Sequence, residues 1–433
     1  MKHTVIFWFR RDLRLADNHA LFQALQTGHL VQPVFIFDRS ILGRLSDSKD
    51  ARVTFIWQQL QALNTALAPY GTSIKIYHDH CLEAWQQIVA EFRPQQVFCN
   101  RDYEPAAGLR DLEIQAFLGE QHISFQSFKD QVIFHEKDVV KADGNPYTVY
   151  TAYKNKWLAQ YEIAGSDSYA SEDLLQLLQP GIHPLPRLAE LGFQASEIHF
   201  PENEAYDVMA DYLSTRDIPS LENGTSRLGV HLRFGTISIR KLVAEAYSMV
   251  EKTFLKELIW REFFMMILYH FPHTVTKAFM PKYDLIVWRN QQAEFQAWCE
   301  GRTGYPLVDA GMRELNHSGF MHNRVRMLCA SFLCKHLLID WRWGEAYFAE
   351  KLLDYDQSAN IGNWQWAAGC GTDAAPYFRI FSPMLQQKKF DPNLTYIKKW
   401  IPELTGFGYP QPIVDHTLAR ERCLKTYKSA LNA

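Results

Sequence analysis

The chain has 433 residues, more than one simple hydrophobic core accommodates, so we expect two domains or one large two-lobed body. Its 45 basic and 48 acidic residues nearly balance, so nucleic acid could be bound only through a local basic patch and not through overall charge. The seven cysteines form no C-x-x-C pair, so neither a disulfide framework nor a zinc ribbon is expected. Because the sequence contains no signal-peptide pattern and no apolar run of membrane length, we expect a cytoplasmic protein that acts away from membranes. A monomer without an obligate protein partner is also expected.

Strand-like and helix-like segments alternate through the N-terminal part of the sequence. Apolar runs of strand length occur at residues 5–9, 31–37, 73–77 and 96–99, and segments with helical spacing occur at residues 51–68, 81–92 and 106–118. This alternation is typical of a doubly wound parallel α/β sheet, which we predict for residues 1–132. Since no G-x-G-x-x-G follows the first run, the sheet is not expected to bind a dinucleotide as NAD-type folds do.

The pattern changes twice in the rest of the chain. Residues 133–200 are interrupted by glycine and proline, which predicts a long linker between two domains. Beyond this linker the strand pattern disappears, and long helices are predicted at residues 239–270, 294–301, 310–318 and 323–339. The C-terminal domain, residues 201–433, is therefore expected to be all-α.

Residues 354–383 combine carboxylates, amides, indoles and glycines in a way that is unusual for an ordinary core segment. Glycines in this stretch permit turns and close approach of the backbone to a ligand. Trp364 and Trp366 offer large flat faces, and Asn360 and Asn363 offer amide groups. A planar, polar, redox-active ring would suit such a lining. Turn chemistry and packing alone explain the same composition, and that alternative stays open here.

Two predicted helical faces combine polar side chains with flat or soft ones. Each face has residues at positions i, i+3 and i+4: Glu257, Trp260 and Arg261 on the first, and Asn323, Arg326 and Met327 on the second. Either set could meet one ligand, because its three side chains lie on one face. An ion pair beside a core tryptophan or methionine is the simpler alternative for each.

Small hydroxyls and glycines stand in residues 223–235, just before the helical segment predicted to begin at Ile239. Hydroxyl and backbone N–H groups at a helix entrance form a site for an anion such as a cofactor phosphate. An ordinary N-cap explains the same pattern equally well.

Basic and aromatic residues are interleaved between Tyr377 and Trp400. The basic residues are Arg379, Lys388, Lys389, Lys398 and Lys399, and the stretch holds a single acidic residue, Asp391. This composition suits a surface that binds a phosphate backbone, with a solvated loop as the alternative.

Taken together, these motifs resemble the photolyase/cryptochrome flavoprotein family. The segments that carry the resemblance are residues 10–14 (Arg-Arg-Asp-Leu-Arg), 224–228 (Gly-Thr-Ser-Arg-Leu), 260–263 (Trp-Arg-Glu-Phe), 304–310 (Gly-Tyr-Pro-Leu-Val-Asp-Ala), 321–324 (Met-His-Asn-Arg) and 409–414 (Tyr-Pro-Gln-Pro-Ile-Val). The resemblance covers nearly the whole chain and is greatest to class I cyclobutane pyrimidine dimer photolyases. It implies an α/β antenna domain, a long linker and a helical domain that binds FAD. It also implies damaged DNA as partner, with light-excited FADH⁻ passing an electron to a dimer flipped out of the duplex.

The resemblance assigns roles residue by residue. For the flavin it implies Asn360 at the reactive ring nitrogen, Arg326 with Asp354 beside the ring, Asp356 at its polar edge, and Tyr212, Thr225, Ser226 and Leu228 near the phosphates. For the lesion and DNA it implies Glu257, Asn323, Trp260, Arg261, Met327, Trp366 and Arg379. For photoreduction it implies an electron path through Trp364, Trp341 and Trp288, from inner to outer.

The sequence departs from the family pattern at three places. Gly229 stands where the phosphate loop commonly has serine, and Phe320 stands where tryptophan is common; neither change is expected to abolish FAD binding. Residues 105–107 are Pro-Ala-Ala, where folate-binding relatives place an Asn-Glu pair. Folate is therefore not expected as a second chromophore. A deazaflavin or second flavin near Asp38, Asp102 and Glu104, or no antenna at all, remains open.

The lesion residues distinguish repair of cyclobutane pyrimidine dimers from other activities of the family. A cryptochrome acting in light signalling would be expected to lose some of them, yet Glu257, Trp260, Asn323, Met327 and Trp366 are all present. A (6-4) photoproduct photolyase needs histidine acid–base chemistry at the lesion, and single-strand-preferring DASH cryptochromes usually change the Trp366 and Met327 positions. Iron–sulfur relatives need four clustered cysteines, which the spacing here does not offer. Repair of cyclobutane pyrimidine dimers is therefore the predicted activity.

Overall fold

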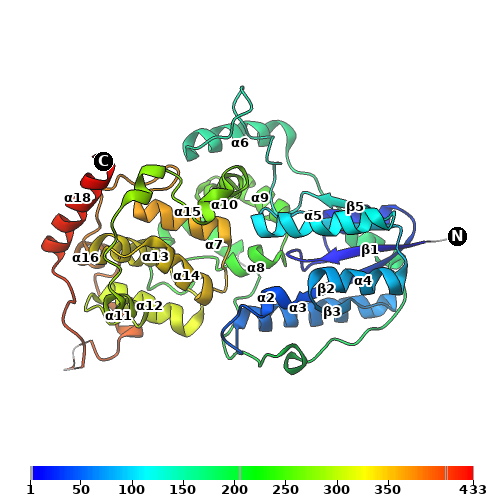
Figure 1. Cartoon of the computed structure of the whole chain (residues 1–433), viewed down its shortest axis with the longest axis horizontal. Coiled ribbons are helices and arrows are strands. Elements are labelled where there is room, and N and C mark those ends of the chain that lie inside the picture. The colour runs from blue at the N-terminus through cyan, green and yellow to red at the C-terminus, as the bar shows by residue number, and fades with distance from the viewer. Residues whose placement is uncertain (1–2, 204–205, 405, 407, 433) are drawn as a thin grey trace. The chain divides into compact units, whose positions relative to one another are not determined.

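The computed structural model of the chain describes residues 3–203, 206–404, 406 and 408–432 (Figure 1). The chain forms two compact units. The first comprises Met1–Val139, Trp157–Asn203 and Leu228–Ser248, and the second comprises Val140–Lys156, Glu204–Arg227 and Met249–Ala433. The two units thus interleave along the chain. The three consecutive ranges predicted from the sequence stay a prediction.

A parallel five-stranded sheet forms the centre of the first unit, which confirms the predicted α/β class. The strand order is β3-β2-β1-β4-β5, as in a doubly wound sheet. The strands are β1 (Thr4–Phe9), β2 (Leu30–Asp38), β3 (Lys75–Asp79), β4 (Gln96–Asn100) and β5 (Ser124–Phe128). The helices of this unit are α1 (His19–Gln26), α2 (Arg39–Leu42), α3 (Ala51–Leu67), α4 (Cys81–Phe92), α5 (Pro105–Glu120), α8 (Gly229–Phe234) and α9 (Ile239–Ser248).

Helices cover both faces of this sheet. Helix α4 buries Cys81, Ala84, Trp85 and Ile88, the i, i+3, i+4, i+7 pattern of an amphipathic helix. These side chains share one core with α5 and with one set of alternating strand residues, such as Ile6 of β1. Helix α1 contacts β1, β2, β4 and β5 and takes the other face. Because both faces are covered, β1 is an almost fully buried apolar run.

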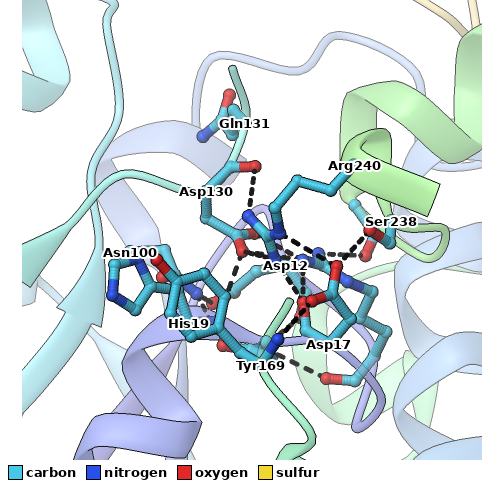
Figure 2. Close-up of polar contacts among 12 residues, drawn as sticks. Asp12, Asp17, His19, Asn100, Asp130, Gln131, Tyr169, Ser238 and Arg240 are labelled. Carbon is cyan, nitrogen blue, oxygen red and sulfur yellow. Dashed lines mark hydrogen bonds and ion pairs between the residues drawn. The ribbon is translucent and has the colours of Figure 1, made fainter. Parts of the chain in front are cut away.

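A buried ionic cluster lies within the first unit, beyond the end of β1 (Figure 2). Arg240 at the start of α9 pairs with Asp17 through Nε and with Asp130 through Nη2, each at 2.9 Å. Arg14 contacts the same Asp130 carboxylate at 2.7 Å. Although burial disfavours the charged carboxylate, the two guanidinium groups outweigh it and hold the pKa of Asp130 below its usual range. The cluster joins α9 to chain segments more than a hundred residues earlier in the sequence.

The second unit consists mainly of helices, which confirms the predicted class for the C-terminal region. Its helices are α7 (Tyr206–Thr215), α10 (Thr253–His270), α11 (Gln292–Cys299), α12 (Pro306–Ser318), α13 (Asn323–Ser331), α14 (Trp341–Lys351), α15 (Gln357–Ala368), α16 (Pro383–Phe390), α17 (Thr395–Trp400) and α18 (His416–Asn432). None of the helices in the described ranges is long and apolar enough to cross a membrane. All seven cysteines of the chain are buried and outside disulfides.

Three predicted segments differ from the structure. The helix predicted over residues 239–270 is two helices, α9 and α10, and the Glu251 side chain in the connection between them accepts the N–H of Thr253, the first residue of α10, at 2.8 Å. The helix predicted over residues 323–339 ends at Ser331 and continues as a π-helical turn, Phe332–Leu337 (η6), which stops at Leu338 in the left-handed region. The predicted linker contains a regular helix, α6 (Tyr150–Ala164).

Candidate functional site

A pocket of about 600 Å³, including its open mouth, lies within the second unit between α13, α14 and α15. We call it the central pocket. Its lining residues are Asn323, Arg326, Met327, Ala330, Phe348, Leu352, Asp354, Tyr355, Asp356, Ala359, Asn360, Asn363, Trp364, Trp366 and Ala367. Eight of these residues carry roles that the sequence assigned by resemblance: Asn323, Arg326, Met327, Asp354, Asp356, Asn360, Trp364 and Trp366. A lining that mixes apolar, amide and charged groups is typical of a site for a flat polar ligand.

Helix α15 supplies much of this lining because of how it begins and packs. Asp356 caps its N-terminus by accepting the N–H groups of Ser358 and Ala359 at 3.1 and 3.2 Å. On the side of the helix away from the pocket, a Cβ added at Gly362 would lie 2.2 Å from Phe264 of α10, so only glycine permits this close packing. The cap and the glycine together fix the register in which α15 faces the pocket.

Arg326 and Asp354 form a bidentate ion pair in the pocket wall. The guanidinium donates to the two carboxylate oxygens at 3.1 and 2.9 Å, and its Nε donates to the carbonyl oxygen of Met321 at 2.6 Å. The pair is only partly buried. Because opposite charges face each other in a fixed fork, the pair offers a rigid, nearly neutral polar edge to a ligand.

Asn360 has both amide hydrogens engaged. Its Nδ2 donates to the backbone oxygen of Glu345 at 3.1 Å and to the Glu345 carboxyl oxygen at 2.9 Å. A backbone oxygen only accepts, so the amide orientation is fixed, and Oδ1 is the group left for a ligand. Burial raises the pKa of Glu345. Glu345 was not found from the sequence, because nothing near Asn360 in the chain signals a partner on α14.

Trp364 is buried, with 2% of its surface exposed, and packs among other aromatic rings. Its ring meets Phe348 at a centroid distance of 5.0 Å and Trp298 at 6.1 Å. Gly344 of α14 lies directly against the Trp364 ring. Among the described residues, Trp364 has no ring contact with Trp341, which the resemblance placed next in the electron path. The contact with Trp298 was not predicted, because scattered tryptophans are most often core residues.

The predicted face on α10 lies outside the lining of the central pocket. Glu257 pairs with Arg216 at 2.6 Å. Trp260 stacks on Tyr150, with ring centroids 3.6 Å apart and planes 8° from parallel. Arg261 is half-buried on the same helix. Both new partners, Arg216 and Tyr150, come from segments far from α10 in the chain, so helical spacing could not reveal them.

The predicted phosphate loop contains a short helix of its own. Thr225 and Ser226 are half-buried, and the six-residue helix α8 starts at Gly229, whereas the helix predicted to begin at Ile239 is confirmed as α9. Arg227 between them and the helix has a positive φ of 51°, an unusual conformation for a side-chain-bearing residue. Leu228 is buried and belongs to the first unit.

Tyr212 of α7, also assigned to the cofactor phosphates, is held on two sides. Its ring meets Phe254 edge-on at 5.1 Å, and the guanidinium of Arg216 lies 5.2 Å from its centroid. Burial and the nearby Glu257 raise the pKa of Tyr212 to about 12, so the phenol stays protonated and can donate a hydrogen bond. The outer indoles of the expected electron path lie elsewhere in this unit: Trp341 is buried under the guanidinium of Arg342, and Trp288 meets Tyr427 edge-on at 6.0 Å.

The basic segment, residues 377–400, presents its cations to solvent. All five basic side chains are exposed: Arg379, Lys388, Lys389, Lys398 and Lys399. The single acidic residue, Asp391, is 2% exposed and accepts the N–H groups of Tyr396 and Ile397 at 3.1 and 2.9 Å. Because Asp391 is used inside the fold, it screens the cations less than the sequence composition suggests.

The residues considered for a second chromophore lie in the first unit. Asp38 accepts the N–H of Ser40 at 2.8 Å and caps α2. Arg11 pairs with both Asp102 and Glu104 at 3.0 Å, and this arginine keeps the pKa of Asp102 low against the opposing effect of burial. Asp102 and Glu104 are therefore engaged with a cation of the chain itself.

Comparisons with known proteins identify both halves of the chain. A family model described as DNA photolyase matches residues 5–173, and one described as the FAD binding domain of DNA photolyase matches residues 254–408. A deoxyribodipyrimidine photo-lyase of Agrobacterium fabrum is 36% identical over 98% of this chain and 97% of its own length.

Solved structures agree with these matches. A bacterial class III photolyase from Agrobacterium tumefaciens superposes with a TM-score of 0.87 at 33% identity, covering 100% of this chain and 98% of its own. An archaeal photolyase from Sulfolobus tokodaii with two FAD molecules superposes with a TM-score of 0.83 at 34% identity, covering 98% of this chain and 100% of its own. Since one of these structures is called class III, the predicted likeness to class I does not fix the class. With family models matching in both halves and a relative above 30% identity along nearly the full length, the chain belongs to the DNA photolyase family.

Proposed function

We propose that this protein uses light to split cyclobutane pyrimidine dimers in DNA. The observation that supports this most is the composition of the central pocket. One cavity is lined both by residues assigned to a flavin and by residues assigned to the lesion, namely Arg326, Asp354 and Asn360 in the first group and Asn323, Met327 and Trp366 in the second. FAD, when bound, supplies the light-excited electron that opens the ring of the dimer.

The residues of the central pocket fit a flavin ring. Asn360 offers only its Oδ1 acceptor, because Glu345 holds both amide hydrogens. Such an acceptor pairs with an N–H group and therefore favours a ring nitrogen that carries a proton, as in a reduced flavin. The fixed Arg326–Asp354 pair meets polar ring atoms without adding net charge. Glu345 is thus a positioning residue that sets which atom Asn360 presents.

The lesion residues act by contact and orientation. Asn323 and Glu257 hydrogen-bond the polar edges of the pyrimidines, Trp366 and Trp260 provide flat surfaces, and Met327 provides a soft apolar contact. Arg216 holds the Glu257 carboxylate at 2.6 Å, which limits the rotamers that Glu257 can adopt. Arg379 and the rest of the basic segment contact phosphates and position the DNA without reading its sequence.

Illumination of the reduced protein with defined damaged oligonucleotides tests the proposal. One oligonucleotide carries a thymine dimer and the other a (6-4) photoproduct, and an absorption spectrum taken beforehand shows whether a second chromophore is bound. Conversion of the thymine dimer alone back to intact thymines supports the proposal. Repair of the (6-4) photoproduct alone would place the protein with the (6-4) photolyases. Light-dependent flavin changes without repair of either lesion would favour a cryptochrome-type role.

Replacing Glu257 by alanine is expected to weaken dark binding of thymine-dimer DNA at least about tenfold, the usual cost of losing a hydrogen bond that involves a charged group. The number of dimers split per absorbed photon by pre-reduced enzyme should also fall. Glu350→Ala, which removes an exposed carboxylate of α14, is the matched control and should change neither quantity. Unchanged binding and yield in Glu257→Ala would show that its assigned role is wrong.

Replacing Trp364 by phenylalanine is expected to slow photoreduction from oxidised FAD strongly, because phenylalanine is much harder to oxidise than an indole. Repair by pre-reduced enzyme should be spared, and loss of repair in that assay would refute the electron-path assignment. Trp341→Phe and Trp298→Phe, measured side by side, show which indole follows Trp364. The ring contact at 6.1 Å favours Trp298, and the family resemblance favours Trp341.

A further inference from the structure

Tyr150 stacks on one face of Trp260. The two rings are stacked with centroids 3.6 Å apart and an interplanar angle of 8°, the closest ring distance that Trp260 makes within the described chain. Its other ring contacts, with Phe263 at 5.5 Å and Phe264 at 5.4 Å, are looser. Tyr150 is 8% exposed, whereas Trp260 is only half-buried. The pair therefore presents the indole outward and keeps the phenol ring behind it.

The phenol ring is fixed by more than stacking. The Tyr150 hydroxyl donates to the backbone oxygen of Lys256 at 2.7 Å, one helical turn before Trp260 on α10. Its backbone N–H donates to the Asp373 carboxylate at 3.2 Å, and the Thr372 hydroxyl donates to the backbone oxygen of Thr148. The segment around Tyr150 is thus tied both to α10 and to the loop that follows α15.

We propose that Tyr150 is a substrate-positioning residue that holds the Trp260 indole in the orientation in which it meets the damaged bases. This inference rests on the proposed function, because the orientation of Trp260 matters only if its ring contacts the lesion. With Tyr150 behind it, the indole is held in one rotamer before DNA arrives, so binding does not have to order it. The covered face is unavailable to a base, so the pyrimidines meet the indole on its remaining surface.

The test uses FAD-loaded, full-length protein and dark binding of two matched oligonucleotides, one undamaged and one with a thymine dimer. Tyr150→Leu removes the ring, and its affinity for the dimer DNA should fall about three- to tenfold, the change expected for losing an aromatic stacking pair. Affinity for undamaged DNA and the amount of bound FAD should stay unchanged. Tyr150→Phe keeps the ring and loses one hydrogen bond, so its preference for damaged DNA should stay close to that of the wild type.

Tyr153→Leu is the matched control. Tyr153 lies one turn further along the same helix, is 2% exposed and contacts Phe263 and Glu262, but makes no ring contact with Trp260 in the described structure. The Tyr153→Leu variant should keep the wild-type preference for damaged over undamaged DNA. If Tyr150→Leu binds dimer DNA as the wild type does, or loses affinity equally for damaged and undamaged DNA, the positioning role is overturned.

A double-mutant cycle separates this inference from the proposed function. In a Trp260→Leu background, Tyr150→Leu should cause no further loss of preference for dimer DNA, because there is no indole left to position. A further loss would show that Tyr150 acts independently of Trp260 and would overturn the inference. If Trp260→Leu itself leaves dimer binding unchanged while the lesion is still repaired, the role of Trp260 falls and the proposed function stands.

Discussion

Replacing Arg240 by methionine is expected to lower the free energy of unfolding of the first unit by about 3–5 kcal/mol, the range for removing one partner of a buried ion pair. Arg240 is 3% exposed, and its loss leaves the carboxylates of Asp17 and Asp130, each 1% exposed, with Arg14 as the remaining nearby cation. Urea unfolding followed by circular dichroism measures the change. Arg187→Met, which breaks an exposed pair with Glu190, is the control and should cost about 0–1 kcal/mol.

The size of this loss should depend on pH. The pKa of Asp130 is lower in the folded chain than in the unfolded one, so its stabilising contribution is present above the unfolded value and disappears as the pH falls through the folded one. In the Arg240→Met protein this carboxylate is easier to protonate. The difference in free energy of unfolding between the wild type and Arg240→Met is therefore expected to be greatest at neutral pH. It should shrink below about pH 4, near the unfolded pKa of aspartate. A difference that grows as the pH falls would contradict the assignment.

Raising the salt concentration is expected to weaken binding to damaged DNA by about 500-fold between about 50 and 200 mM, if all five exposed cations of the basic segment meet phosphates. The corresponding slope of log affinity against log salt is about −4.5, because each neutralised phosphate contributes about −0.9. Fluorescence anisotropy with a labelled thymine-dimer duplex measures the slope. An affinity that does not change with salt would show that the basic segment does not contact the DNA phosphates.

Removing two of these cations sharpens the test. Lys388→Ala combined with Lys389→Ala, at the end of α16, should make the slope shallower by about 1.8, and it should do so on undamaged DNA as well. Lys49→Ala combined with Lys241→Ala is the matched control, since these lysines of the first unit are similarly exposed and make only long surface ion pairs. Equal changes in the two double variants would indicate a general charge effect.

The fold follows from the sequence where a segment carries its own signal. The period of α4 and the continuous apolar run of β1 placed these elements to within a residue, because one helical face and one buried strand each leave a regular pattern. The break between α9 and α10 was missed because apolar spacing continues on both sides. The cap residue of the second helix is Lys252, which makes no side-chain cap hydrogen bond, so the sequence carries no typical N-cap signal at the break.

In the candidate site, too, only residues with a local sequence signal could be predicted. Asp356, Asn360 and Trp364 of the central pocket stand close together in the sequence, where family motifs and helical spacing find them. Glu345 and Tyr150 act through contacts between segments that are distant in the chain, and such contacts leave no periodic signal. Local composition predicts which residues meet a ligand, whereas the contacts behind those residues become visible only in three dimensions.

The interleaving of the two units has a consequence for synthesis on the ribosome. The sheet of the first unit is encoded before residue 130, but Arg240, which pairs with both Asp17 and Asp130, comes much later. The nascent first unit therefore cannot complete its buried cluster until residue 240 has left the exit tunnel, after the second unit's segments 140–156 and 204–227 have been made. Completion of the N-terminal half thus waits for translation to pass the middle of the message.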